Sequence, residues 1–154
     1  DRSPAEMTAF DTATLQLDNQ LCFALYSTSL MMTKTYKPLL QALGLTYPQY
    51  LAMLVLWENE GITVSEISAR MLTDPGSLTP LLKRLESEGL LQRRRSSEDE
   101  RVVQLYLTDK GRALHEQAKA LPACVLKASG LDLPTLSKLR DDLVDLRQHL
   151  QEAL

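Results

Sequence analysis

The chain has 154 residues, of which 44% are hydrophobic and 24% charged, and its net charge is −3. This length corresponds to about one domain, which can bury a core without disulfides or a metal. No apolar run approaches the roughly 20 residues that span a bilayer, so we expect no membrane segment and a cytoplasmic location. The two cysteines are then expected to be thiols rather than a structural bridge.

Positive charge is concentrated in the centre of the chain. Residues 70–112 hold nine of the 17 Lys and Arg and seven of the 20 acidic residues, a local balance of +2 in an acidic protein. A mildly basic centre between acidic flanks fits a protein that presents one face to a polyanion, and it also fits an ordinary solvated surface. The pattern of the predicted elements has to decide between these two.

The first half of the chain predicts two helices. Residues 11–36 carry apolar residues at helical spacing and contain no Gly or Pro, which predicts one long helix that ends near Pro38. In the connector that follows, Gly44 suits a helix C-cap and Thr46 an N-cap. The next stretch, QYLAMLVLWEN, is apolar almost all round, so this second helix is expected to be buried.

Two short helices follow, separated by a few turn residues. Thr63 and Glu66 form a capping-box pattern that opens the first of them. Asp74 and Pro75 indicate the start of the second helix, which carries four leucines on one face. Pro80 leaves the start of this helix open, because a start at Asp74 puts the proline inside it and a start at Ser77 makes the proline harmless. The pair is typical of a helix-turn-helix.

The remainder predicts a β-hairpin and two helices. Residues 90–107 contain two short runs around a polar tip, and the second run alternates with period two. Residues 109–129 return to a helical pattern that Pro122 is expected to bend. A last helix opens at Asp132 and carries leucines at 3-4-3-4 spacing, which is typical of a seam for another helix. The sequence thus predicts one mainly α chain with a small hairpin: a winged helix-turn-helix with helical extensions at both ends.

A winged helix-turn-helix typically binds DNA without covalent chemistry. With the leucines facing inward, the outer side chains of the second helix can touch bases and phosphates. These candidates are Ser77, Thr79, Lys83 and Arg84. Arginine suits phosphates and narrow minor grooves, and the candidates at the hairpin tip are Arg93, Arg95 and Arg101. The acidic Asp99 fits this tip if it holds the fork of Arg101, whereas a solvated, salt-bridged hairpin or a surface for protein contacts remains the alternative.

The stretch SLTPLLKRLESEGLLQRRRSSEDERVVQLYLTDKGRAL resembles the centre of the MarR family of bacterial transcription regulators. The shared features are Leu-Glu-x-x-Gly-Leu at the end of the recognition helix, Asp-x-Arg in the wing and Leu-Thr-x-x-Gly after it. The resemblance implies a homodimeric repressor with a DNA-binding region at 46–108 and dimerisation regions at 10–45 and 109–154. It also implies a pseudo-palindromic operator of double-stranded DNA, with half-sites about 10 bp apart.

Cys22 lies within the apolar run DNQLCFALY, where a cysteine is ordinarily a small core residue. Its sequence neighbours do not favour a thiolate, since residues 5–32 contain no Lys, Arg or His and Asp18 opposes ionisation. Phenolic hydroxyls can donate to the sulfur instead, and the candidates are Tyr26, Tyr36 and Tyr47.

Residues 17–58 resemble the organic-hydroperoxide-sensing OhrR branch of the MarR family. The resemblance implies a peroxide-reactive Cys22 that is hydrogen-bonded by Tyr36 and Tyr47. It implies Cys124 as the resolving cysteine of the other subunit, with organic hydroperoxide as the inducer that releases the operator. Sulfenic acid formation followed by condensation with a thiol is the corresponding sulfur chemistry.

Three other functions compete with this hypothesis. A MarR-type repressor released by a small phenolic ligand would have inert cysteines. A two-cysteine thiol peroxidase would turn over, but the chain lacks a CxxC and a thioredoxin-like βαβ pattern. A winged helix used only for protein contacts would show no salt-dependent DNA binding. We expect no enzyme activity and no cofactor. We also expect no metal site, since His115 and His149 have no ligand-like spacing with either cysteine.

Overall fold

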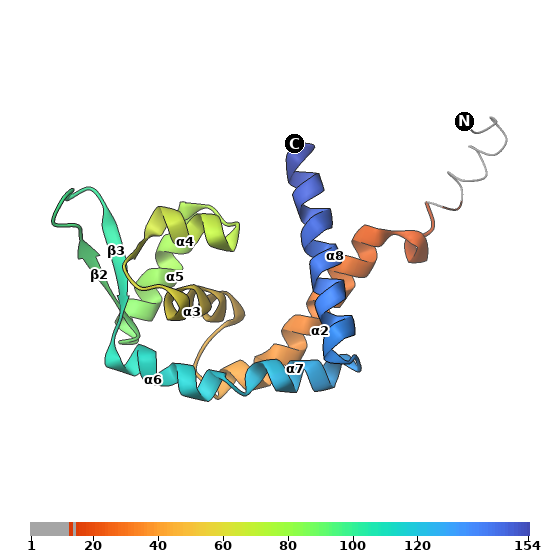
Figure 1. Ribbon diagram of the computed structural model, residues 1–154, viewed down its shortest axis with the longest axis horizontal. Helices are drawn as coiled ribbons and strands as arrows, with labels where there is room; N and C mark the ends of the chain where they lie inside the picture. Colours follow the sequence, from red (N-terminus) through yellow and green to blue (C-terminus); the bar gives the residue numbers. More distant parts are fainter. Residues whose placement is uncertain (1–12, 14) are drawn as a thin grey trace.

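The computed structural model describes residue 13 and residues 15–154, which form a mainly helical chain with one small sheet (Figure 1). The elements are η1 (Leu17–Asn19), α2 (Leu21–Gln41), α3 (Tyr47–Glu58), β1 (Ile62–Thr63), α4 (Val64–Met71), α5 (Pro75–Ser87), β2 (Leu91–Arg95), β3 (Val103–Leu107), α6 (Asp109–Ala118), α7 (Leu121–Ser129) and α8 (Leu133–Glu152). The expected class, a winged helix-turn-helix with helical extensions at both ends, is confirmed.

Residues 47–107, from α3 to β3, pack around one core and are called the winged unit below. Helix α3 is apolar on all sides and lies in the middle of this core, with Ala52, Met53 and Leu56 fully buried. The leucine stripe of α5 faces inward as the sequence predicted. The sheet has the order β1-β3-β2, and every pair is antiparallel. The two-residue strand β1 has no signal of its own in the sequence, because its pairing with β3 defines it.

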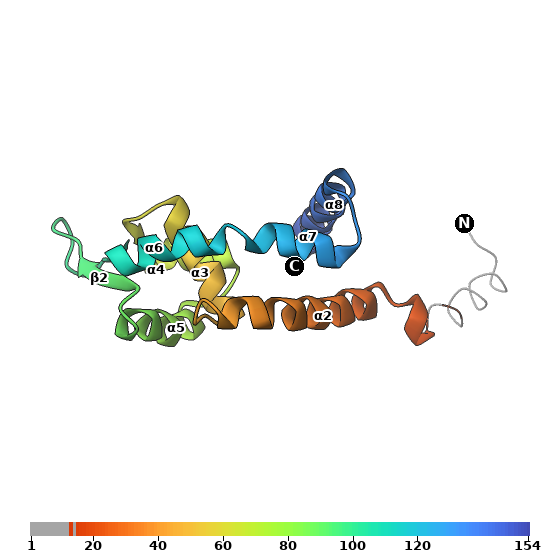
Figure 2. The same ribbon diagram turned by 90° about the horizontal axis from the view of Figure 1, so that it is seen from below.

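The helical extensions lie beside the winged unit (Figures 1 and 2). The C-terminal part of α2 joins the core, where Leu40 is buried and Tyr36 packs against it. The N-terminal part of α2 projects away from that core, and α7 runs alongside it. No residue of α8 is buried. The leucines of these extensions therefore face a surface that the single chain does not cover.

The predicted helix over 11–36 was wrong at both ends. The predicted helix is interrupted, because Ala13 is helical but α2 begins only at Leu21, after the short turn η1; residues 11, 12 and 14 lie outside the described part. The Asn19 side chain donates to the Ala13 carbonyl oxygen at 2.8 Å, a local bond that competes with helix formation. At the other end the helix continues through Pro38 to Gln41. The proline deprives only the Lys34 carbonyl of its helical partner, and both residues are exposed to water.

Two other prolines lie at helix positions that the sequence left unclear. Helix α5 starts at Pro75 with Asp74 as its N-cap, so Pro80 lies inside the helix and frees the exposed Gly76 carbonyl. The expected bend at Pro122 is a full break, since α6 ends at Ala118 and α7 begins at Leu121. Pro122 then occupies the first turn of α7, where its missing N–H costs nothing.

Candidate recognition surface and thiol site

The start of α5 is organised by its N-cap. The Ser77 backbone N–H and hydroxyl both donate to the Asp74 carboxylate, at 2.8 and 2.9 Å. The Thr79 hydroxyl donates to the Pro75 carbonyl oxygen at 2.8 Å. These hydroxyls therefore use their protons within the helix and present oxygen lone pairs outward. One to two turns further on, Lys83 and Arg84 are exposed.

At the tip of the wing, Asp99 holds Arg101 as the sequence suggested. The guanidinium donates Nε–H to Oδ1 at 3.1 Å and Nη2–H to Oδ2 at 3.2 Å, and the Arg101 backbone N–H also donates to Oδ1 at 3.0 Å. These bonds hold the pKa of the Asp99 carboxyl below its usual range. Because 90% of the Arg101 side chain is exposed, the fork is oriented and still free to meet another group.

The other wing arginines make contacts within the chain. Arg93 donates to Glu86 at the end of α5, with its backbone N–H at 3.0 Å and its Nε–H at 3.3 Å. Arg95 closes the tip by donating to the Glu100 carbonyl oxygen at 2.7 Å. Arg94 lies over the Tyr106 ring with its guanidinium carbon 4.4 Å from the centroid. Arg93 thus joins α5 to the wing, a contact that no local pattern announces.

The two cysteines lie exposed on different helices of the extension. Cys22 is at the start of α2, and Cys124 is on α7. Both helices line an apolar groove of about 1120 Å³, which α8 completes. Leu25 of the groove lies three residues after Cys22, and Cys124 lies between the lining residues Ala123 and Val125. Neither cysteine lines the groove itself, but each lies on a helix that does.

Of the three tyrosines named as thiolate donors, Tyr36 and Tyr47 lie together and Tyr26 lies apart from them. Tyr36 and Tyr47 meet edge to face, with ring centroids 5.1 Å apart, and Tyr50 joins them. Tyr26 is alone at the other end of α2, one turn after Cys22, and is exposed. Cys22 and Tyr36 are 14 residues apart on one helix, which corresponds to about 21 Å. The chain thus brings Tyr36 and Tyr47 together but keeps them away from its own Cys22.

Two of the clustered tyrosines, Tyr36 and Tyr50, have raised pKa values. Burial, assisted by the neighbouring Tyr50 and Tyr47, raises the pKa of Tyr36 to about 12. Burial also raises the pKa of Tyr50. The Tyr36 hydroxyl is therefore a proton donor over the whole physiological pH range.

The described residues contain no helix that is long and apolar enough to cross a membrane. Within the same part of the chain, His, Cys, Asp and Glu do not gather into any group of three that could hold a metal ion. The site is therefore built from thiols, phenols and arginines.

Comparisons with known proteins identify the family. The model of the transcriptional regulator SarA/Rot family matches residues 34–118. The organic hydroperoxide resistance transcriptional regulator of Bacillus subtilis (strain 168) is 47% identical over 138 residues, which are 90% of this chain and 94% of that protein. A MarR-family regulator from Rhodococcus sp. RHA1 is 25% identical, with a TM-score of 0.77 over 86% of this chain and 95% of that one. This chain belongs to the MarR family of transcription regulators.

Within the MarR family the similarity to the Bacillus subtilis protein assigns the chain to the organic-hydroperoxide-sensing branch, as the sequence motifs indicated. It is a transcription regulator. Structures of AbfR, known from Staphylococcus epidermidis, are also similar. One is 33% identical with a TM-score of 0.76, over 92% of this chain and 98% of that chain. AbfR in reduced form on DNA scores 0.73 and in disulfide form 0.62, each at 32% identity and with more than 90% of both chains covered.

Proposed function

We propose that this MarR-family regulator is a homodimeric repressor that senses organic hydroperoxides through Cys22 and leaves its operator when Cys22 is oxidised. The observation that carries this proposal is the placement of the two thiols. Both are exposed in the single chain, on α2 and α7, the two helices that line the apolar groove together with α8.

Operator binding is assigned to α5 and the wing. The outer groups of α5, which are Ser77, Thr79, Lys83 and Arg84, meet base edges and phosphates in the major groove. Arg101, held by Asp99, enters the adjacent minor groove or binds its phosphates. The structures of reduced AbfR on DNA, at 32% identity, support this assignment for a chain of the same shape.

A second copy of the chain completes the thiol site. The groove and the leucines of α8 are uncovered in the single chain, and a partner that brings its own leucines at 3-4-3-4 spacing buries both. Tyr36 lies about 21 Å along α2 from the Cys22 of its own chain, so its hydroxyl can reach a Cys22 sulfur only in the partner subunit. The raised pKa of Tyr36 keeps its proton in place for donation to a thiolate.

The chemistry needs no cofactor. The Cys22 thiolate attacks the outer oxygen of the hydroperoxide, the O–O bond breaks, and the sulfur becomes a sulfenic acid while the peroxide is reduced to an alcohol. Cys124 of the partner subunit then attacks the sulfenic sulfur, which forms a disulfide and releases water. A disulfide requires Cα atoms within about 7 Å, so α2 and α7 of the two subunits are drawn together and the winged units shift.

A shape change on disulfide formation is supported by the AbfR structures. The present chain scores 0.73 against the reduced, DNA-bound form and 0.62 against the disulfide form of AbfR. The overoxidised form of AbfR bound to DNA also scores 0.73, so the disulfide form is the least similar of these three structures to the present chain. This difference is what a release mechanism based on rearrangement requires.

Fluorescence anisotropy of a labelled operator, selected from random DNA with reduced protein, tests the proposal. One equivalent of an organic hydroperoxide should release the wild-type protein, and dithiothreitol should restore binding. Cys22→Ser should stay bound under peroxide. Cys124→Ser is the matched control, since it should still lose its Cys22 thiol but form no interchain disulfide on a non-reducing gel.

Two results would contradict the proposal. Release of Cys22→Ser by peroxide would remove Cys22 from the sensing role. Release of the wild-type protein by an aromatic ligand, with both thiols intact and no response to peroxide, would instead make the groove a small-ligand site.

A further inference from the structure

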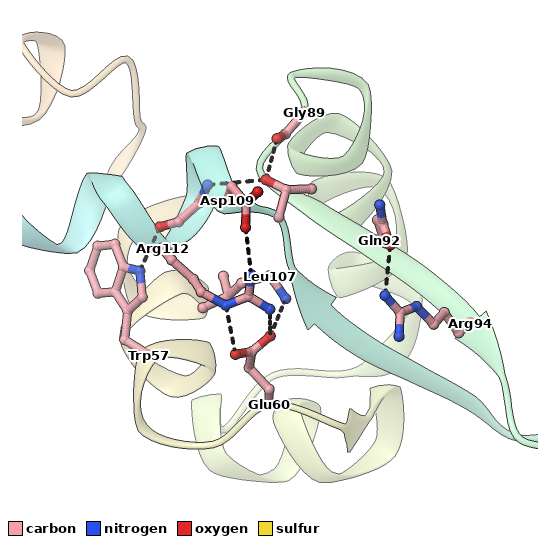
Figure 3. A network of polar contacts seen from close by, with 10 residues as sticks. Trp57, Glu60, Gly89, Gln92, Arg94, Leu107, Asp109 and Arg112 are labelled. Atoms are coloured by element: carbon pink, nitrogen blue, oxygen red, sulfur yellow. Dashed lines mark hydrogen bonds and ion pairs between the residues drawn. The ribbon is translucent and has the colours of Figure 1, made fainter.

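The end of α3 meets the start of α6 through a set of hydrogen bonds (Figure 3). Glu60 accepts the Leu107 backbone N–H at 2.8 Å. The same carboxylate takes the Arg112 fork on both oxygens, from Nε–H at 3.1 Å and from Nη2–H at 2.9 Å. Beside it, the Trp57 indole N–H donates to the Gly111 carbonyl oxygen at 3.0 Å. We call these five residues the α3–α6 junction.

Helix α6 is also fastened to the end of α5. The Thr108 hydroxyl donates to the Gly89 carbonyl oxygen at 2.6 Å, and the Lys110 ammonium donates to the Glu88 carbonyl oxygen at 3.0 Å. Gly111 lies so close to the Leu90 carbonyl that a Cβ would overlap its oxygen. Although α6 follows the winged unit in the chain, these contacts make it mechanically a part of that unit.

The helical structure is interrupted immediately after α6. Lys119 and Ala120 separate α6 from α7, and both residues are exposed. Helix α7 packs against α2 instead, and it carries Cys124. Any displacement of α7 that reaches the winged unit along the C-terminal half of the chain must therefore pass through α6.

We propose that Glu60 and Arg112 are positioning residues that lock α6 to the winged unit, so that movement of α7 turns the recognition surface instead of being absorbed between β3 and α6. The transmission of an oxidative signal rests on the function proposed above. The locking itself does not, because it concerns how the winged unit is held on the helical extension in the reduced state.

The geometry favours orientation over stability as the role of this pair. A single exposed ion pair contributes little to folding. Here, however, the planar guanidinium of Arg112 donates to both carboxylate oxygens of Glu60, and the backbone N–H of Leu107 at the end of β3 is a third donor. These bonds define the angle between α6 and the end of α3. Half of the Arg112 side chain is exposed, and its replacement leaves no buried group unpaired. Variants at this pair should therefore fold.

The chain offers a matched control two residues away. Glu58 at the end of α3 accepts from Arg70 Nη2–H at 2.8 Å, and both side chains are more than half exposed. Arg70 lies on α4, inside the winged unit, whereas Arg112 lies on α6. The two pairs share their chemistry and differ in the element that they tie to α3.

The experiment compares Glu60→Gln and Arg112→Gln with Glu58→Gln and Arg70→Gln. Operator affinity is measured by anisotropy for the reduced and the peroxide-oxidised protein, and Cys22 oxidation is quantified by mass spectrometry. Trp57 is the only tryptophan of the chain, so its emission reports the junction directly. We expect the junction variants to oxidise like the wild type, to shift the Trp57 emission, and to bind the operator more weakly in the reduced state. Their affinity ratio between reduced and oxidised protein should fall about 3- to 30-fold.

Each outcome decides the proposal. If Arg112→Gln matches the wild type both in reduced-state operator affinity and in the ratio of reduced to oxidised affinity, the proposed locking role is wrong. It is also wrong if Arg70→Gln loses as much operator affinity as Arg112→Gln. If the wild-type protein itself does not respond to peroxide, the redox function fails. The reduced-state arm then still decides the locking role, through weaker binding of Arg112→Gln than of Arg70→Gln.

Discussion

The guanidinium of Arg101 is held by one carboxylate at the wing tip while most of its surface remains exposed. Side-chain hydrogen bonds from Arg101, followed by its backbone N–H, keep the pKa of Asp99 below the usual range. A carboxyl whose pKa is lowered in the folded state contributes its full stabilisation of that state above its unfolded pKa. It loses this stabilisation as the pH falls through its folded pKa. The fork should therefore stay oriented from neutral pH down to the ordinary pKa range of Asp.

Substitutions at this pair separate orientation from charge. Arg101→Gln should lower the slope of log Kd against log salt by about one, because one phosphate-neutralising charge is lost. Asp99→Asn should leave that slope intact and weaken operator binding about 2- to 10-fold, which is the contribution of one hydrogen bond. Salt titrations of operator anisotropy measure both effects.

Asp142→Asn is the control for the wing pair. Asp142 pairs with Lys138 on α8, which is remote from the wing, and its loss should not change DNA binding. Equal salt slopes for Arg101→Gln and the wild type would mean that Arg101 does not meet DNA.

Among the elements, α6 depends on one glycine. The sequence marks Gly111 only as part of a Leu-Thr-x-x-Gly motif. In the structure its backbone conformation is an ordinary helical one, and the constraint is instead the close approach to the Leu90 carbonyl. A contact between backbone atoms has no flexible side chain that could move aside, so the α6 position is set by the absence of a Cβ.

Gly111→Ala should therefore destabilise the fold by about 3 kcal/mol, the range of overpacked sites. Thermal unfolding followed by circular dichroism measures this loss. Gly130→Ala is the control, since its Cβ would meet nothing within 4 Å and only its φ of +71° opposes alanine. That variant should lose about 1 kcal/mol. Equal losses in both would refute the close-approach explanation.

At the scale of the whole molecule, the helical extension is unfinished in one chain. Leu139, Leu143 and Leu150 of α8 are 50%, 37% and 58% exposed, and they stand beside the uncovered groove. Contiguous exposed apolar surface of this kind marks an interaction site, and we have proposed a second copy of the chain as its occupant.

Leu143→Glu should shift the protein from dimer to monomer, because a carboxylate placed in the buried seam costs more than one leucine contributes. Sedimentation velocity measures the change. Leu72→Glu is the control, since Leu72 is 53% exposed in the turn between α4 and α5 and lies away from the groove. A Leu143→Glu protein that remains dimeric would exclude α8 as the interface.

The sequence by itself determined the class of the protein and most of its elements. The caps at Thr46 and Asp132 and the period-two run before α6 were confirmed, because each depends on residues a few positions apart. The motifs for the MarR family lie in the same local stretches. They assigned the family before any contact between distant residues was known.

Only the tertiary structure decided how these elements are joined. The pairing of Glu60 with Arg112 spans 52 residues, and Arg93 meets Glu86 across the turn between α5 and the wing. Strand β1 exists only through β3, and the continuation of α2 through Pro38 depends on packing of its last turn in the core. Local patterns carry no signal for such features, since their free energy comes from groups that meet only after the chain has folded.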